Sequence, residues 1–332
     1  MSRAAAWLWC ASAFCSAFLS FVVQPLLAKW LLPSFGGSPS TWGACLVFFQ
    51  LMLLVGYGYA RVLSRLPLQW ARALHAALCA VAVGFALWTA LPSLDSGAEL
   101  PPGIRIVWLL LCGAGLPYLL TSSTAPLLSD WAAQLRVSVP HRLYAVSNLG
   151  SLLALAAYPA FIEPSWPLQT QYAFFRGGVL LAALLSLLCW LHTLRAGGSR
   201  TAAEPAPVAW RRRGYWLACA FVPSLLLVAV SNHISVDLAP TPLLWVVPLG
   251  LYLISFIAAF AGWVERARGV LAGAWVVSSS LLAYGAFAQG SARLSLQLTA
   301  ALGSLFCAGL LCHDALVRAR PEPRQLTSFY VW

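Results

Sequence analysis

Charge is what this sequence has least of. Only 9% of its 332 residues are charged, while 61% are hydrophobic and the mean hydropathy is +0.80. An ordinary soluble domain carries about 25% charged residues, because its surface needs polar cover, whereas lipid can face apolar side chains directly. The composition therefore excludes an ordinary soluble domain and predicts an integral membrane protein.

Signatures of catalysis and of metal binding are also missing. The sequence has no HExxH, GxSxG or Walker motif, and the Gly56-Tyr-Gly58 pair lacks the third glycine of a dinucleotide-binding loop. The nine cysteines form no CxxC pair and lie almost entirely in apolar runs, where cysteine behaves as a small hydrophobic residue. We predict no catalytic residue, no cofactor and no metal site. That includes Cys312-His313-Asp314, because three consecutive helical residues cannot all face one ion.

Ten apolar runs are long enough to cross the roughly 30 Å hydrocarbon core of a bilayer as helices. Backbone groups in lipid must be bonded within their own segment, and the runs lack the alternation of barrel strands. The predicted fold class is all-α, a polytopic bundle of about ten transmembrane helices. The runs are residues 5–28, 42–60, 71–91, 104–128, 143–161, 174–194, 214–233, 242–263, 269–288 and 294–313.

Positive charge is distributed unevenly across these runs. If the ten spans alternate, 16 of the 20 Lys and Arg residues lie on the side of the N-terminus, and 4 lie on the other side. Such asymmetry marks the cytoplasmic side, so both termini are predicted to be cytoplasmic in a bacterial inner membrane. The net charge of +11 thus indicates membrane orientation, and we predict no nucleic-acid partner. The four basic residues predicted on the opposite, outer side are Lys29, Arg105, Arg176 and Arg293.

A Gly-, Ala- and Pro-containing segment at residues 195–213 divides the chain into six helices at 1–194 and four at 214–313. We expect this segment to be a cytoplasmic linker. Its last three residues, Arg211, Arg212 and Arg213, are predicted to lie against anionic lipid headgroups, where each charge contributes about 1 kcal/mol. Residues 314–332 are predicted to form a cytoplasmic tail or to contain the start of a further span.

The end of the first run carries the only lysine of the chain. Gln24-Pro25 precedes Lys29, Gly36-Gly37 allows positive φ, and Ser40 or Thr41 is expected to cap the next helix. Lys29 either extends to the outer membrane interface or pairs with an anionic group.

Polar residues also gather at the predicted outer end of the seventh helix, in Asn232, His233 and Asp237. They either satisfy the last carbonyls of the helix and cap a turn, or line an outward-facing pocket together with Gln24, Lys29 and Glu163. His233 and Asp237 are four residues apart, so a continuous helix places them on one face. At the opposite side, the small polar face of Ser147, Asn148, Gly150 and Ser151 predicts close helix packing.

Seven short segments, spread over nearly the whole chain, carry a family resemblance through their order. They are Val23-Gln-Pro25, Phe35-Gly-Gly-Ser-Pro39 with Trp42, Leu116 to Pro126, Arg142 to Ser151, Ile162-Glu-Pro164, Ser231 to Asp237, and Leu311-Cys-His313. Together they resemble the membrane module of bacterial fused MFS/spermidine-synthase-like proteins.

That family normally continues into further helices and a cytoplasmic Rossmann-type domain like an aminopropyltransferase. This sequence ends at Trp332 without such a domain, so the resemblance implies a polyamine-related role only for a longer product. Two hypotheses follow. The bundle binds or transports a small charged solute or polyamine, or it anchors a synthase-like enzyme domain that lies outside this chain.

Overall fold

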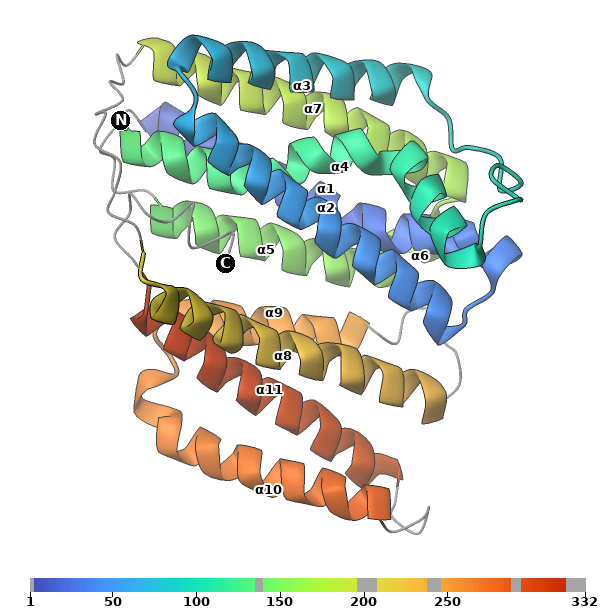
Figure 1. Cartoon of the computed structure of the whole chain (residues 1–332), viewed down its shortest axis with the longest axis vertical. Helices are drawn as coiled ribbons and strands as arrows, with labels where there is room; N and C mark the ends of the chain where they lie inside the picture. Colours follow the sequence, from blue (N-terminus) through green and yellow to red (C-terminus); the bar gives the residue numbers. More distant parts are fainter. Residues whose placement is uncertain (1–2, 135–139, 196–207, 238–245, 288–293, 321–332) are drawn as a thin grey trace. The chain divides into compact units, whose positions relative to one another are not determined.

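The chain forms two compact helical units, which we describe separately (Figure 1). Unit 1 consists of residues 1–206 with 321–331, and unit 2 of residues 207–320 with Trp332. In the described part of the chain every regular element is a helix. This computed structural model describes residues 3–134, 140–195, 208–237, 246–287 and 294–320.

Unit 1 is built around its first helix, which packs against α4, α5 and α7, while α2 packs against α4 and α3 packs against α7 and α4. The central position explains why so many side chains of the first helix are fully buried. The elements of unit 1 are α1 (Arg3–Phe35), α2 (Pro39–Arg65), α3 (Leu68–Trp88), α4 (Pro102–Gln134), α5 (Pro140–Ala157), the π-helix η1 (Tyr158–Ile162), α6 (Glu163–Ser165) and α7 (Leu168–Arg195).

The turn between α1 and α2 follows the sequence prediction in one respect and departs from it in another. Gly36 has a φ of 66°, the positive value that glycine tolerates, as predicted. The cap of α2 is Ser38 rather than Ser40 or Thr41, because the helix begins at Pro39. The Ser38 side chain accepts a hydrogen bond from the Thr41 N–H at 3.3 Å. Proline suits the first helical position because its missing N–H would be unpaired there.

The predicted close packing of the 147–151 segment is confirmed at Gly150. This residue lies on α5 directly against the backbone of α1, so that an added Cβ would stand 2.7 Å from the Phe14 carbonyl oxygen. Small residues allow helix backbones to approach in lipid, where van der Waals contact replaces the hydrophobic effect as the driving force. Gly150 therefore sets the spacing of α1 and α5.

Helix α4 contains two internal prolines and a run of four hydroxyl residues, and hydrogen bonds satisfy the carbonyl that Pro117 leaves free as well as the four hydroxyls. Pro117 has no N–H, which frees the carbonyl of Gly113 four residues earlier, and the Tyr172 hydroxyl on α7 donates to that oxygen at 2.9 Å. The hydroxyls of Thr121 to Thr124 donate to carbonyls three or four residues earlier in the same helix. Such back-bonding lets a polar run sit inside an apolar bundle.

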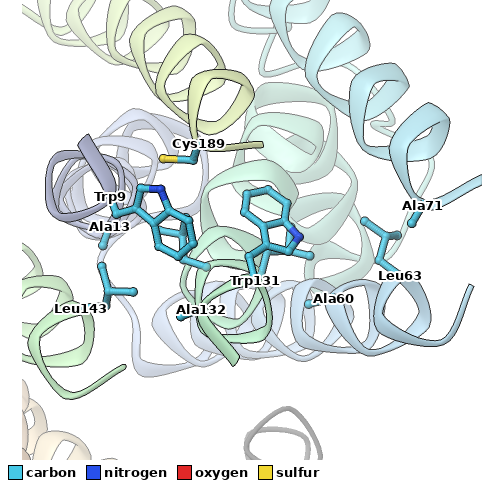
Figure 2. Close-up of a cluster of buried hydrophobic side chains, with 11 residues drawn as sticks. Trp9, Ala13, Ala60, Leu63, Ala71, Trp131, Ala132, Leu143 and Cys189 are labelled. Atoms are coloured by element: carbon cyan, nitrogen blue, oxygen red, sulfur yellow. The ribbon is translucent and has the colours of Figure 1, made fainter. Parts of the chain in front are cut away.

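A cluster of buried apolar side chains fills unit 1 near the N-terminal end of α1 (Figure 2). Trp9 of α1 is fully buried, and Trp131 of α4 is 8% exposed. Alanines and leucines from α1 to α5, together with Cys189 of α7, fit around the two indoles. Mixing large and small side chains in this way brings the helices into close van der Waals contact.

Unit 2 is built around its last helix, α11, which packs against the other three helices of the unit. Gly309 of α11 allows a close approach to α9, since an added Cβ would lie 2.6 Å from Ser255 Oγ. The axis of the chain bends by 104° between α9 and the segment that contains α10. The elements of unit 2 are α8 (Trp210–Asp237), α9 (Val246–Phe260), the 3₁₀-helix η2 (Glu265–Ala267), α10 (Arg268–Phe287) and α11 (Leu294–Arg318).

The helices make this chain a multi-pass membrane protein by length and composition. Within the described residues, eight helices are long and apolar enough to cross a membrane, and the bent pair of α9 and α10 raises the number to nine if it counts as one span. A helix covers most of each of the ten predicted apolar runs, while residues 242–245 and 288 of two runs lie outside the described residues. However, the 15 residues of α9 extend only about 22 Å at 1.5 Å per residue, less than the hydrocarbon core. The predicted count of ten spans therefore remains a prediction.

Candidate functional site

The structure joins two of the predicted site residues directly. Lys29 Nζ of α1 lies 2.7 Å from Glu163 Oε1 of α6, within one compact unit. About a third of each side chain is exposed, 35% for Lys29 and 33% for Glu163. The protein therefore covers both charged groups only in part.

The length of α1 places Lys29 far from the N-terminal end of the bundle. From Arg3 to Lys29 the helix rises about 39 Å at 1.5 Å per residue, more than the roughly 30 Å of a hydrocarbon core. The ammonium group is therefore expected at the membrane boundary opposite the N-terminus, where a cation is less costly than at the centre.

A π-helical turn presents Glu163. The turn η1 contains Pro159, and the N–H of Glu163 donates to the carbonyl of Tyr158 five residues earlier. The Tyr158 hydroxyl in turn donates to Gln171 Oε1 at 2.9 Å, and Gln171 Nε2 donates to the Trp166 carbonyl at 2.8 Å. Short π-helical turns are frequent at functional sites because they re-aim side chains out of the regular helical register. Here the turn and the two hydrogen bonds anchor the segment of backbone that carries Glu163.

Gln24, the third predicted residue in unit 1, has different partners. Its Nε2 donates to the Ser20 carbonyl at 2.9 Å and lies 3.4 Å from the hydroxyl of Tyr118 on α4. Below it, Ser20 Oγ donates to Thr121 Oγ1 at 2.8 Å. Gln24 and Lys29 are five residues apart, which is about 140° around a helix, so they face different neighbours. Gln24 belongs to a polar seam between α1 and α4 rather than to the ion pair.

The other three predicted residues belong to unit 2. Asn232 is exposed and His233 is half-buried on α8. This helix runs through Asp237, so His233 and Asp237 lie one turn apart on a continuous helix, while the Asp237 side chain is outside the described part. Their role in a binding pocket stays a prediction.

Two of the other cations predicted on the Lys29 side are held by backbone carbonyls of unit 1. The Arg176 guanidinium of α7 donates to the carbonyls of Ala86 and, at 2.6 Å, of Leu87 at the end of α3. Arg105 donates to the Leu94 carbonyl and lies over the Phe35 ring, 5.2 Å from its centroid. A guanidinium at the C-terminal end of a helix satisfies unpaired carbonyls and complements the helix dipole. These arginines therefore have structural partners, whereas Lys29 has an ionisable one. Arg293 lies outside the described residues.

Sequence reasoning missed a buried histidine in unit 1. His75 of α3 is 1% exposed, with Nε2 3.0 Å from Ser186 Oγ of α7 and Nδ1 3.4 Å from the Tyr59 hydroxyl of α2. The ring also meets the edge of Trp131 at 5.5 Å between centroids. The available signal was an ionisable residue within an apolar run. The imidazole links three helices and is fully occupied by these contacts.

A second missed cluster lies in unit 2. Asp314 of α11 is 5% exposed, accepts a hydrogen bond from Arg268 Nε at 2.7 Å and forms an ion pair with Arg318 Nε at 3.1 Å. The adjacent His313 turns to another side, with Nδ1 3.1 Å from Ser255 Oγ. This divergence agrees with the argument that neighbouring helical residues cannot share one ion. Among the described residues no three His, Cys, Asp or Glu side chains are grouped to hold a metal.

Two of the three arginines at residues 211–213 have partners within the protein. Arg212 donates to the carbonyls of Ala319 and Arg320 at 3.2 and 3.3 Å, and Arg213 lies over the Trp210 ring at 4.8 Å. Arg211 is exposed. Arg212 thus ties the start of α8 to the residues that follow α11, in addition to any lipid contact.

In comparisons with known proteins, no protein-family model matches this chain, and no curated protein matches it significantly. Function therefore has to be argued from the chemistry of the site.

Proposed function

We propose that this chain is a bacterial inner-membrane protein that binds, and in the complete transport cycle carries, a small charged solute at the Lys29–Glu163 pair. The observation that supports this most is the pair itself, one cation and one anion 2.7 Å apart and one-third exposed at one end of the central helix. Ionisable groups near membrane depth are costly to retain and usually mark pathways or sites. A chain with 9% charged residues has few of them to place.

We propose further that the chain crosses the membrane ten times, with both termini in the cytoplasm. The positive-charge asymmetry of 16 to 4 supports this orientation. An even number of spans keeps the termini on one side, and nine spans would not. In this arrangement Arg211 lies at the cytoplasmic surface, where anionic headgroups are its natural partners.

The binding proposal is tested with the full chain purified into lipid nanodiscs. Equilibrium binding of radiolabelled small solutes from three charge classes, cationic, anionic and zwitterionic, is measured for wild type and for Lys29→Gln and Glu163→Gln. We expect saturable binding of at least one class, weakened at least tenfold by both substitutions. Glu99→Gln makes the same chemical change as Glu163→Gln at an exposed loop position of unit 1 and should leave binding unchanged. The proposal fails if no class binds, or if Glu99→Gln has the same effect as Glu163→Gln.

The resemblance to spermidine-synthase-like proteins supports a second candidate, in which the bundle anchors a synthase-like enzyme domain supplied outside this chain. This candidate expects aminopropyltransferase activity to copurify with the membrane chain from its source cell. It does not require solute binding at Lys29, so the nanodisc experiment separates the two candidates.

A further inference from the structure

The charge balance of the Lys29–Glu163 pair restricts which solutes can bind between its two charged groups. The pair holds one positive and one negative group in direct contact, so its net charge is zero. A solute that enters between them keeps both charges matched only if it provides a partner for each, since water at this one-third-exposed position compensates a separated charge only in part. A singly charged solute can provide only one partner.

The hydrogen-bonding capacity of the two groups also favours a solute that carries both a positive and a negative charge. A lysine ammonium has three donors and a carboxylate has two acceptor oxygens, and the observed contact uses Nζ and Oε1. A ligand carboxylate placed on the Lys29 side and a ligand ammonium on the Glu163 side would form two charge-assisted contacts in place of one. The π-helical turn and the Tyr158–Gln171 hydrogen bond hold the Glu163 end in place while the flexible lysine side chain adjusts.

We propose that the ligand of this site is zwitterionic, with an ammonium group and an anionic oxygen group a few ångströms apart, as in a free amino acid. This inference rests on the proposed binding function and narrows it to a substrate class. In the absence of ligand, Lys29 and Glu163 neutralise each other through their direct contact. The same chemistry occurs in the headgroup of phosphatidylethanolamine, and the position of the pair near the membrane boundary makes that source accessible too.

The first experiment compares probes that share fragments. L-alanine, methylamine, acetate and putrescine are titrated against the full chain in nanodiscs of phosphatidylglycerol alone. We expect L-alanine to bind at least tenfold more tightly than the other three. Lys29→Gln should remove this preference and retain methylamine, whereas Glu163→Gln should remove it and retain acetate. These opposite changes in selectivity are not expected if the pair only links two helices.

The source of the ligand is distinguished by the lipid. If a headgroup is the natural occupant, adding phosphatidylethanolamine to the nanodiscs should weaken the apparent affinity for L-alanine at least fivefold. If a free solute is the occupant, the affinity should stay the same. Both results support zwitterion recognition and differ only in its source.

A second measurement needs no variant, because Lys29 is the only lysine of the chain. Acylation by an amine-reactive ester, read by mass spectrometry, therefore reports on Lys29 beside the terminal amine, which serves as the internal control. N,N-dimethylglycine, a zwitterion that the ester does not consume, should slow acylation of Lys29 at least fivefold. Acetate and trimethylamine at the same concentration should not.

The outcomes separate the two levels of the proposal. Binding of methylamine, acetate or putrescine as tight as that of L-alanine would overturn the zwitterion assignment and leave a charged-solute site in place. An absence of binding by every probe, with no protection of Lys29, would overturn both.

Discussion

The contact between Gly150 and the backbone of α1 allows a stability prediction with a defined magnitude. Gly150→Ala adds a Cβ that would lie 2.7 Å from the Phe14 carbonyl oxygen and 3.3 Å from Phe14 Cδ2. Since the nearer atom belongs to the backbone, no side-chain rotation can relieve the contact. The two helices must separate locally by roughly 0.3 to 0.7 Å, in an interior packed as densely as an organic crystal.

Overpacking of this kind typically costs about 1–3 kcal/mol. The substitution also gains about 0.5–1 kcal/mol, because alanine loses less conformational entropy than glycine in a helix. We therefore expect a net loss of about 0–2.5 kcal/mol in the free energy of unfolding. Gly177→Ala on α7 is the matched control, since an added Cβ there meets no atom within 4 Å. Gly177→Ala should raise the free energy of unfolding by the helix-propensity contribution alone, about 0.5–1 kcal/mol.

The assay is equilibrium unfolding in mixed micelles with a rising fraction of sodium dodecyl sulfate, followed by circular dichroism. The difference between the two alanine variants removes the propensity term and should equal the overpacking cost of about 1–3 kcal/mol. If both variants are stabilised equally, α1 and α5 do not approach as closely as the Gly150 contact implies, and the packing argument is wrong.

Two further substitutions test how unit 1 satisfies its backbone. Tyr172→Phe removes the donor to the Gly113 carbonyl and should lower the free energy of unfolding by about 1–3 kcal/mol. In the Pro117→Ala background, where the helix regains its own N–H donor, the same substitution should have a much smaller effect, and additive effects in this double-mutant cycle would contradict the account. Arg176→Gln removes the guanidinium from the last carbonyls of α3, so amide hydrogen exchange should rise at the C-terminal end of that helix. Unchanged exchange there would show that the arginine is dispensable as a cap.

The helices could be predicted from the sequence because apolar length and helical geometry leave few choices in lipid. Where local chemistry was decisive the prediction also succeeded, as at Gly36, whose position after a proline-containing helix end requires positive φ. It was wrong at the neighbouring cap, since Pro39 begins the helix earlier than the Ser40 or Thr41 prediction assumed. The break between α9 and α10 was predicted by the gap between the runs 242–263 and 269–288, but its angle of 104° was not, because a hydrophobic run defines length and not direction.

The candidate site was predictable in composition and not in geometry. The side of the membrane assigned to Lys29 and Glu163 followed from counting charges, but their contact depends on a π-helical turn that residue spacing does not indicate. The sequence alone could have shown that Gln24 and Lys29 face different neighbours, because five residues correspond to about 140° around a helix. His75 escaped attention because its partners, Ser186 and Tyr59, come from distant parts of the chain and only tertiary packing brings them together.

The ways in which this bundle places its charges explain why the Lys29–Glu163 pair differs from the rest. Arg176 donates to two backbone carbonyls at the end of α3, which are fixed dipoles, so its movement leaves no ionised partner behind. Asp314 is held between two arginines, so removal of either partner still leaves it neutralised. The Lys29–Glu163 contact is one-to-one, and its members come from separate helices. It can open without breaking backbone hydrogen bonds, and once open it leaves two complementary charges that a zwitterion satisfies together. Exchangeability, rather than strength, is therefore the property on which the proposed site rests.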